Sequence, residues 1–271
     1  MNMNYIPTLT IAGSDSSGGA GIQADLKAMS ALGCYAMSVL TAVTAQNTQG
    51  VLGVQPISAE MVALQLQAVL EDIPPLAIKT GMLFDATIIE AVASALEQVD
   101  IPLVVDPVMV ATSGDRLLSK EAETVLKRRL LPLATLLTPN LIEAEVLSGV
   151  KIDSRSALYA SGQYLLAHGP KAVLIKGGHT ADTEATDYLF TNKGVTTFSS
   201  ARIETVNTPG TGCTLSAAIT AYIARGLLLE KAIEQGKGYL SEALSSGKMV
   251  AIGQGHGPVD HFFQPQSSIK R

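Results

Sequence analysis

The sequence predicts an α/β fold: a three-layer αβα sandwich around a mostly parallel central sheet, with an antiparallel hairpin at one edge near 185–199. Short apolar runs alternate with longer amphipathic stretches along the chain, which is the pattern of βαβ units. The alternation breaks once, where ATDYLFT and GVTTFSS flank Asn192-Lys193. Because no linker, internal repeat or low-complexity tract separates these elements, we expect residues 1–271 to form a single domain.

The predicted strands are short β-rich runs that end in polar or glycine-rich sequence, as buried parallel strands do. They cover 8–12, 36–42, 76–80, 103–106, 136–138 and 172–176. The predicted helices lie between the strands, and two more close the chain. They cover 21–32, 59–70, 86–98, 120–130, 141–147, 154–168, 212–225 and 229–245.

One uncharged segment, 28–45, is long enough to raise the question of a membrane span. Gly33 lies where a helix C-cap belongs, and the run SVLTAVT after it is β-rich. We therefore interpret the segment as the end of a helix followed by a strand, and we expect no membrane partner.

Composition and charge exclude several classes of protein. With 47% hydrophobic and 16% charged residues the chain is neither disordered nor fibrous. The net charge of −5 gives no overall field that would attract nucleic acid, so no nucleic-acid partner is expected. The two cysteines make a poor disulfide framework and the first residues lack a secretory signal, which favours a cytoplasmic location.

The strongest chemical signal is NTPGTGCT, which opens an apolar helix. Gly210 and Gly212 let the backbone curl around Thr211 so that N–H groups converge, and the helix start adds partial positive charge. This predicts an anion hole able to hold a phosphate in transfer. The alternative is a glycine-rich turn before a buried helix.

Cys213 lies in the first turn of that helix, where the helix dipole can lower the pKa of its thiol. It could then accept the proton of a substrate hydroxyl or orient that hydroxyl. The alternative is a small buried side chain. Cys34, on the apolar approach to a strand, is expected to be part of the core.

The first strand leads into GSDSSGGAGIQAD. The lysine of a Walker A loop is missing after Gly18, and the GxGxxA run at 19–24 begins too far from the strand for a dinucleotide fingerprint. A glycine-rich loop that approaches a ligand remains. Asp25, in the following helix, could bind that ligand or could cap and solvate the helix.

Polar and apolar residues follow the next strands, at the edge where α/β sheets bind ligands. Gln46, beside Asn47, offers a donor and an acceptor that match an aminopyrimidine, although a polar strand exit is the alternative. Met82 and Val108 could enclose an aromatic ring. Lys176 could neutralise leaving-group charge or could be a solvated surface lysine.

Two carboxylates could hold a metal. Asp106 and Glu143 suit Mg²⁺ beside nucleotide phosphates, since this ion prefers few carboxylates and much water. Asn140 and Glu143, three residues apart, also fit helix N-capping without a ligand. None of the histidines shows metal-ligand spacing, so no zinc site is expected. They are His168, His179, His256 and His261.

Taken together, these motifs resemble the ribokinase-like small-molecule kinases, and among them the hydroxymethylpyrimidine/phosphomethylpyrimidine kinases of thiamin synthesis. The resemblance rests on 10–27, 41–50, 79–83, 106–109, 138–145, 175–179 and 207–219. It implies ATP and Mg²⁺ as cofactors and phosphorylation first of an alcohol and then of its monophosphate. We also expect a homodimer. It places Asp25, Gln46, Met82 and Val108 on the pyrimidine, Gly210, Thr211, Gly212 and Cys213 at the anion hole, Asn140 and Lys176 at ATP, and Asp106 and Glu143 at the metal.

Two departures from the wider pattern bear on substrate choice. Cys213 replaces the catalytic carboxylate usual in sugar kinases of this fold, which makes a sugar substrate less expected. Pro209 stands where many relatives carry histidine, and it removes one backbone donor while it stiffens the turn. A pyridoxal or pyridoxine kinase, alone or as a second activity, is the main alternative. A non-catalytic nucleotide-binding protein and a nicotinamide oxidoreductase are more distant ones.

Overall fold

The computed structural model describes residues 4–109, 118–177 and 184–270. Its main element is an eight-stranded sheet in the order β10-β9-β8-β7-β6-β5-β1-β2. Six neighbouring strands of this sheet, β8, β7, β6, β5, β1 and β2, are parallel to one another. The β9–β10 hairpin is antiparallel and lies at the edge, as predicted. The strands are β1 (Pro7–Ala12), β2 (Tyr35–Leu40), β5 (Ala77–Thr80), β6 (Leu103–Val105), β7 (Leu136–Leu137), β8 (Val173–Ile175), β9 (Glu184–Thr191) and β10 (Gly194–Ala201).

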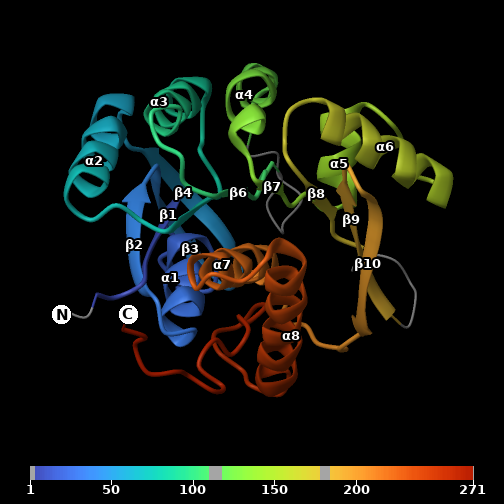
Figure 1. The fold of residues 1–271 in the computed structure, drawn as a ribbon. Helices are drawn as coiled ribbons and strands as arrows, with labels where there is room; N and C mark the ends of the chain where they lie inside the picture. The colour runs from blue at the N-terminus through green and yellow to red at the C-terminus, as the bar shows by residue number, and fades with distance from the viewer. Residues whose placement is uncertain (1–3, 110–117, 178–183, 271) are drawn as a thin grey trace.

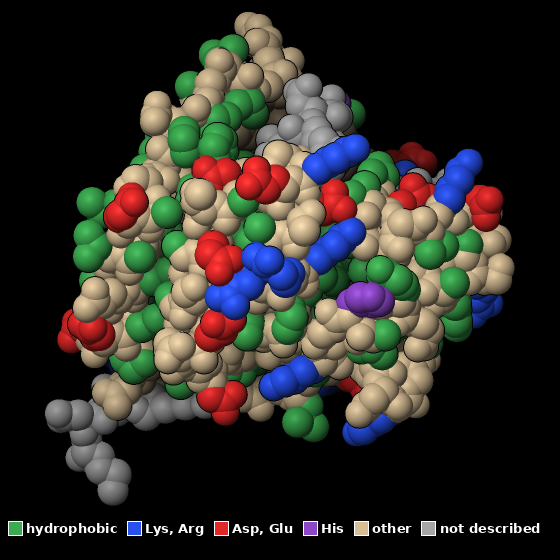
Figure 2. All heavy atoms as spheres, turned by 90° about the horizontal axis from the view of Figure 1, so that it is seen from above, with side chains coloured by type: hydrophobic (Ala, Val, Ile, Leu, Met, Phe, Trp, Pro, Cys, Tyr) green, Lys and Arg blue, Asp and Glu red, His purple; other side chains and the backbone are tan. Residues whose placement is uncertain are grey.

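Helices cover both faces of this sheet, which confirms the three-layer fold (Figure 1). The first face carries α1 (Gly21–Ala31), α7 (Thr211–Ala224) and α8 (Leu229–Gly247). The second carries α2 (Ala59–Asp72), α3 (Ala86–Leu96), α4 (Lys120–Val125), α5 (Leu141–Ser148) and α6 (Arg155–Ala167). Each face buries its own apolar cluster against the sheet. On the outer surface of the second layer, acidic and basic side chains are interspersed (Figure 2).

Local sequence explains where these helices begin. Several start at a residue whose side-chain oxygen accepts the backbone N–H three positions later, which satisfies one donor that the first turn leaves free. These residues are Ser58, Asp85, Ser119, Asn140 and Ser154. Because the carboxyl ends of parallel strands meet at one edge, the loops that follow β1, β5, β6, β7 and β8 come together there.

A second, small sheet was not predicted. The expected strand 36–42 ends at Leu40, and the chain then forms β3 (Ala42–Asn47), which pairs antiparallel with β4 (Gly50–Pro56). The Asn47 side chain accepts the N–H groups of Gln49 and Gly50 and so closes the turn. The apolar residues of β4 are exposed, with Leu52 81% accessible, so this strand lacks the buried character on which the prediction relied.

Other boundaries differ less. The helix expected over 120–130 is α-helical only to Val125 and continues as a π-helical turn, Leu126–Leu130. The uncharged segment 28–45 contains the end of α1, a left-handed Gly33 (φ +80°) and β2, as interpreted, and also the first residues of β3, which were not predicted as a separate strand. Of the helices that the structure describes, none is both long and apolar enough to cross a membrane.

Candidate active site

The start of α7 has the form of an anion site. Gly210 is the N-cap with φ +79°, and a β-carbon there would collide with the Gly19 carbonyl oxygen. Glycine is therefore required both for the left-handed backbone and for the close approach. The N–H groups of Gly212 and Cys213 donate to no acceptor within the described parts of the chain. Two unsatisfied donors at a helix N-terminus attract an anion.

The glycine-rich loop after β1 packs its backbone against this helix start. Asp15 holds the loop together, because its carboxylate accepts the N–H groups of Ser17, Gly19 and Ala20 at 2.8–3.0 Å. A β-carbon on Gly21 would collide with a carbonyl of the same loop. Asp15 was not singled out from the sequence, although an aspartate just before a Ser-Gly run is a turn signal.

Cys213 is half-buried and belongs to neither apolar cluster, so the alternative of a core side chain is not supported. Burial raises the pKa of its thiol to about 11, while the charge of Lys79 and the backbone N–H of Gly21 pull it down. The prediction of a lowered pKa was therefore wrong: desolvation outweighs the favourable position at the helix start. Cys34 is buried among apolar residues of the first layer, as expected.

A buried ion pair, Lys79 and Asp25, lies close enough to Cys213 for its charges to act on the thiol. Lys79, on β5, has its Nζ 2.8 Å from both carboxylate oxygens of Asp25, on α1, and the Thr10 hydroxyl donates to the same carboxylate at 2.6 Å. Neither charged side chain has accessible surface. Burial raises the pKa of Asp25 despite the neighbouring ammonium, whereas the Asp25 carboxylate raises the pKa of Lys79 despite burial.

This pair corrects one reading of Asp25. The carboxylate is not a solvated helix group, and both of its oxygens are already bound, while its predicted contact with a pyrimidine stays a prediction. Lys79 was missed, although a lysine within an otherwise apolar strand is a detectable signal, since lysine is buried only when it is paired.

The residues predicted to contact the pyrimidine surround the loop after β1. Gln46 lies on β3, where its backbone exchanges two hydrogen bonds with the Ser16 hydroxyl at 2.7 and 2.8 Å. Its side-chain Nε2 has no acceptor in the described structure. The Met82 side chain lies against Gly13, where it would meet a β-carbon. Val108 is half-buried two residues after Asp106.

Lys176 and Asp106 form a second ion pair at the mouth of the anion site. The Lys176 Nζ is 3.0 Å from Asp106 Oδ1, and the Ser216 hydroxyl donates to Oδ2 at 3.1 Å. A β-carbon on Gly212 would lie only 3.4 Å from that Nζ. Burial raises the pKa of Asp106, but the charges of Lys176 and Lys79 outweigh it and hold the carboxyl ionised. The alternative of a solvated surface lysine is wrong.

Asn140 and Glu143 form a capping box at the start of α5. The Asn140 side chain accepts the Glu143 N–H at 2.9 Å, and the Glu143 carboxylate accepts the Asn140 N–H at 2.8 Å. Burial raises the pKa of Glu143 to about 7. The capping alternative is thus confirmed, and the predicted ATP and metal contacts of the two residues stay predictions.

Three of the four histidines, His168, His256 and His261, lie within the described residues. His261 is buried with its Nε2 3.0 Å from the Thr214 hydroxyl, and burial lowers its pKa to about 4, so it is neutral near pH 7. His179 lies outside the described residues. Within those residues no three His, Cys, Asp or Glu side chains gather as metal ligands.

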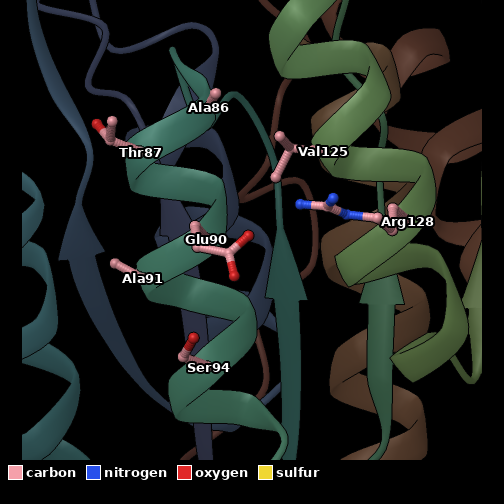
Figure 3. A pocket seen from close by; sticks show the side chains of 7 residues that line it. All are labelled: Ala86, Thr87, Glu90, Ala91, Ser94, Val125 and Arg128. Carbon is pink, nitrogen blue, oxygen red and sulfur yellow. The ribbon is translucent and has the colours of Figure 1, made fainter.

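An open groove of about 540 Å³ lies between α3 and α4 (Figure 3). Its lining includes Thr87, Glu90 and Arg128, and none of the predicted site residues contributes to it.

A parallel sheet with a helix-start anion site, two ion pairs and a thiol at its carboxyl edge is the arrangement of a small-molecule kinase of ribokinase-like fold. The family model for phosphomethylpyrimidine kinase matches residues 15–260. The chain therefore belongs to the phosphomethylpyrimidine kinase family, and it is a phosphotransferase rather than an oxidoreductase or a non-catalytic nucleotide-binding protein.

Individual relatives agree. The hydroxymethylpyrimidine/phosphomethylpyrimidine kinase of Rhizobium meliloti is 50% identical over 255 residues, which cover 94% of this chain and 96% of that protein. A solved phosphomethylpyrimidine kinase from Clostridium difficile is 47% identical, with a TM-score of 0.79 over 88% of this chain and 99% of that one. An ADP complex of Bacillus subtilis pyridoxal kinase is 36% identical, with a TM-score of 0.88 over 95% and 98%.

Proposed function

We propose that this enzyme transfers the γ-phosphoryl group of ATP to the hydroxymethyl oxygen of 4-amino-5-hydroxymethyl-2-methylpyrimidine, and then phosphorylates the resulting monophosphate, in thiamin synthesis. In the first step the new bond joins the alcohol oxygen to γ-phosphorus, the bond to the ADP oxygen breaks, and the alcohol proton must leave. The observation that carries this proposal is the pair of free N–H donors at Gly212 and Cys213, with the Lys176 ammonium beside them.

Each residue then has a distinct task. The anion hole would stabilise negative charge on the transferring phosphoryl group, and Lys176 would stabilise charge on the ADP oxygen. Cys213, on the same helix turn, would face the attacking hydroxyl. The free Gln46 Nε2, with its Oε1, would read the ring nitrogen and amine of the pyrimidine, while Met82 and Val108 would enclose the ring.

The use of ATP is supported by the ADP bound in the Bacillus subtilis relative. Asp106 and Glu143 would hold a Mg²⁺ ion, because these two carboxylates lie close enough to interact electrostatically with each other and with Lys176. Two carboxylates leave the remaining positions to water and phosphate oxygens, as this ion prefers. The ion would neutralise phosphate charge.

We further propose that the protein is a cytoplasmic homodimer. Its interface would bury outward apolar side chains of β3 and β4 such as Val43 and Leu52. Sedimentation velocity of the Leu52→Lys variant tests the dimer.

Turnover of the two candidate alcohols in one mixture tests the substrate. We expect the pyrimidine alcohol to be phosphorylated with at least tenfold higher kcat/KM than pyridoxine. The likeness to a pyridoxal kinase makes pyridoxine the second candidate, and an equal or reversed ratio would assign the enzyme to that activity.

The Gln46→Ala variant tests the binding mode. It should raise KM for the pyrimidine about tenfold, since two hydrogen bonds are lost, and leave KM for ATP unchanged. Gln55→Ala is the control, since Gln55 is an exposed glutamine on β4 whose amide donates to the carbonyl of the next residue, Pro56. Equal damage to both substrates by Gln46→Ala would refute the assigned role.

A further inference from the structure

A buried ion pair outside the site just described joins the last helix to the edge hairpin. Asp187 lies on β9 and Lys237 on α8, with Lys237 Nζ 2.7 Å from Asp187 Oδ2. The two residues are only 4% and 8% exposed. Removing two charges from water is costly, and two apolar side chains in the same place often stabilise a protein as well as a buried ion pair does. We therefore expect this ion pair to have a role other than stability.

The second oxygen of Asp187 reaches the active-site chain. Asp187 Oδ1 accepts the backbone N–H of Gly177 at 3.0 Å. Gly177 lies directly against β9, because a β-carbon on it would collide with the Thr186 carbonyl oxygen. Gly177 immediately follows Lys176, so this bond fixes the backbone on the carboxyl side of the lysine.

The amino side of Lys176 is fixed as well. Its own N–H donates to the Pro139 carbonyl at 2.8 Å, in a short parallel bridge beyond the ends of β7 and β8. The lysine backbone is therefore held from both sides where β8 has already ended. From this position its ammonium reaches Asp106 and the first turn of α7.

We propose that Asp187 is a positioning residue for phosphoryl transfer: it clamps the Lys176–Gly177 backbone so that the lysine ammonium points at the anion hole, and Lys237 supplies the charge that lets a carboxylate do this while buried. The inference rests on the proposed role of Lys176 at the ATP phosphates. It assigns a function at the active site to α8, which contributes none of the predicted site residues.

The test is a double-mutant cycle. Asp187→Ala should lower kcat/KM for ATP at least tenfold and leave KM for the pyrimidine alcohol within twofold, because only the lysine is misplaced. In a Lys176→Ala background the same change should cause no further loss. Equal loss in both backgrounds would overturn the proposal. If Lys176→Ala alone left the ATP kinetics unchanged, that result would instead contradict the proposed role of Lys176 at the ATP phosphates.

Two further variants separate the clamp from folding. Asp187→Asn with Lys237→Met removes both charges but keeps an amide oxygen for the Gly177 N–H, so it should retain ATP kinetics within about threefold even where Asp187→Ala does not fold. An ATP-specific loss of tenfold or more in this folded double variant would contradict the clamp. Lys231→Met, which removes an exposed ion pair from the same helix, should change neither substrate's kinetics.

Discussion

At the scale of single residues, the protonation of Cys213 is the main departure from expectation. The helix start favours the thiolate, yet burial dominates and raises the pKa of the thiol to about 11. At pH 7 roughly one molecule in ten thousand then carries a thiolate. If the thiolate accepts the proton of the alcohol, activity must follow that small fraction.

We therefore expect kcat/KM for the pyrimidine alcohol to rise by close to tenfold per pH unit from pH 7 to about 10, since the raised pKa keeps the thiol protonated over this range. Initial rates with saturating ATP provide the measurement. Cys213→Ser, whose hydroxyl does not ionise there, should lack the rise. A flat profile in both enzymes would mean that Cys213 orients the alcohol without taking its proton.

The Lys79–Asp25 pair gives a stability prediction. Lys79→Met should lower the free energy of unfolding by about 3–5 kcal/mol, because it leaves a buried carboxylate without its counter-charge. Asp25→Asn combined with Lys79→Met removes both charges and should cost much less. Urea unfolding measures both. A double variant as unstable as Lys79→Met would show that packing, and not charge compensation, sets the cost.

At the scale of elements, the start of α7 depends on close backbone packing against the loop after β1. Asp15 shapes that loop through backbone donors, and Gly210 lets it approach. The proposed anion hole thus depends on two segments almost 200 residues apart in the sequence, which meet because α1 and α7 pack side by side on the same face (Figure 1).

Gly210→Ala tests this approach. The added β-carbon would collide with the Gly19 carbonyl, so we expect at least a hundredfold loss of kcat, beyond the cost of about 1 kcal/mol for a left-handed alanine. Gly149 is a matched control, since its φ is +72° and nothing lies within 4 Å of an added β-carbon. Gly149→Ala should lose only stability. Equal kcat for the two variants would contradict the packing argument.

At the scale of the whole molecule, the sequence predicted the elements whose signal is local. Apolar runs and turn residues mark such elements directly. The sequence therefore predicted the buried parallel strands, the places where they end, and the edge hairpin. The fold and the kinase family are confirmed, and a single domain over residues 1–271 remains a prediction.

What could not be predicted depends on three-dimensional contacts. β4 exposes its apolar residues, so this strand has no buried pattern. The Lys79–Asp25 pair joins positions 54 residues apart. The raised pKa of Cys213 comes from surroundings contributed by several elements, which no spacing within NTPGTGCT could reveal.

The most direct measurement compares ADP release by the wild type and by Cys213→Ala, with the pyrimidine alcohol and saturating ATP. If the thiol faces the attacking oxygen beside the anion hole, kcat should fall by at least a hundredfold while KM for ATP stays within twofold. A loss of less than tenfold, about 1.4 kcal/mol of barrier, would contradict a role for this thiol in the transfer.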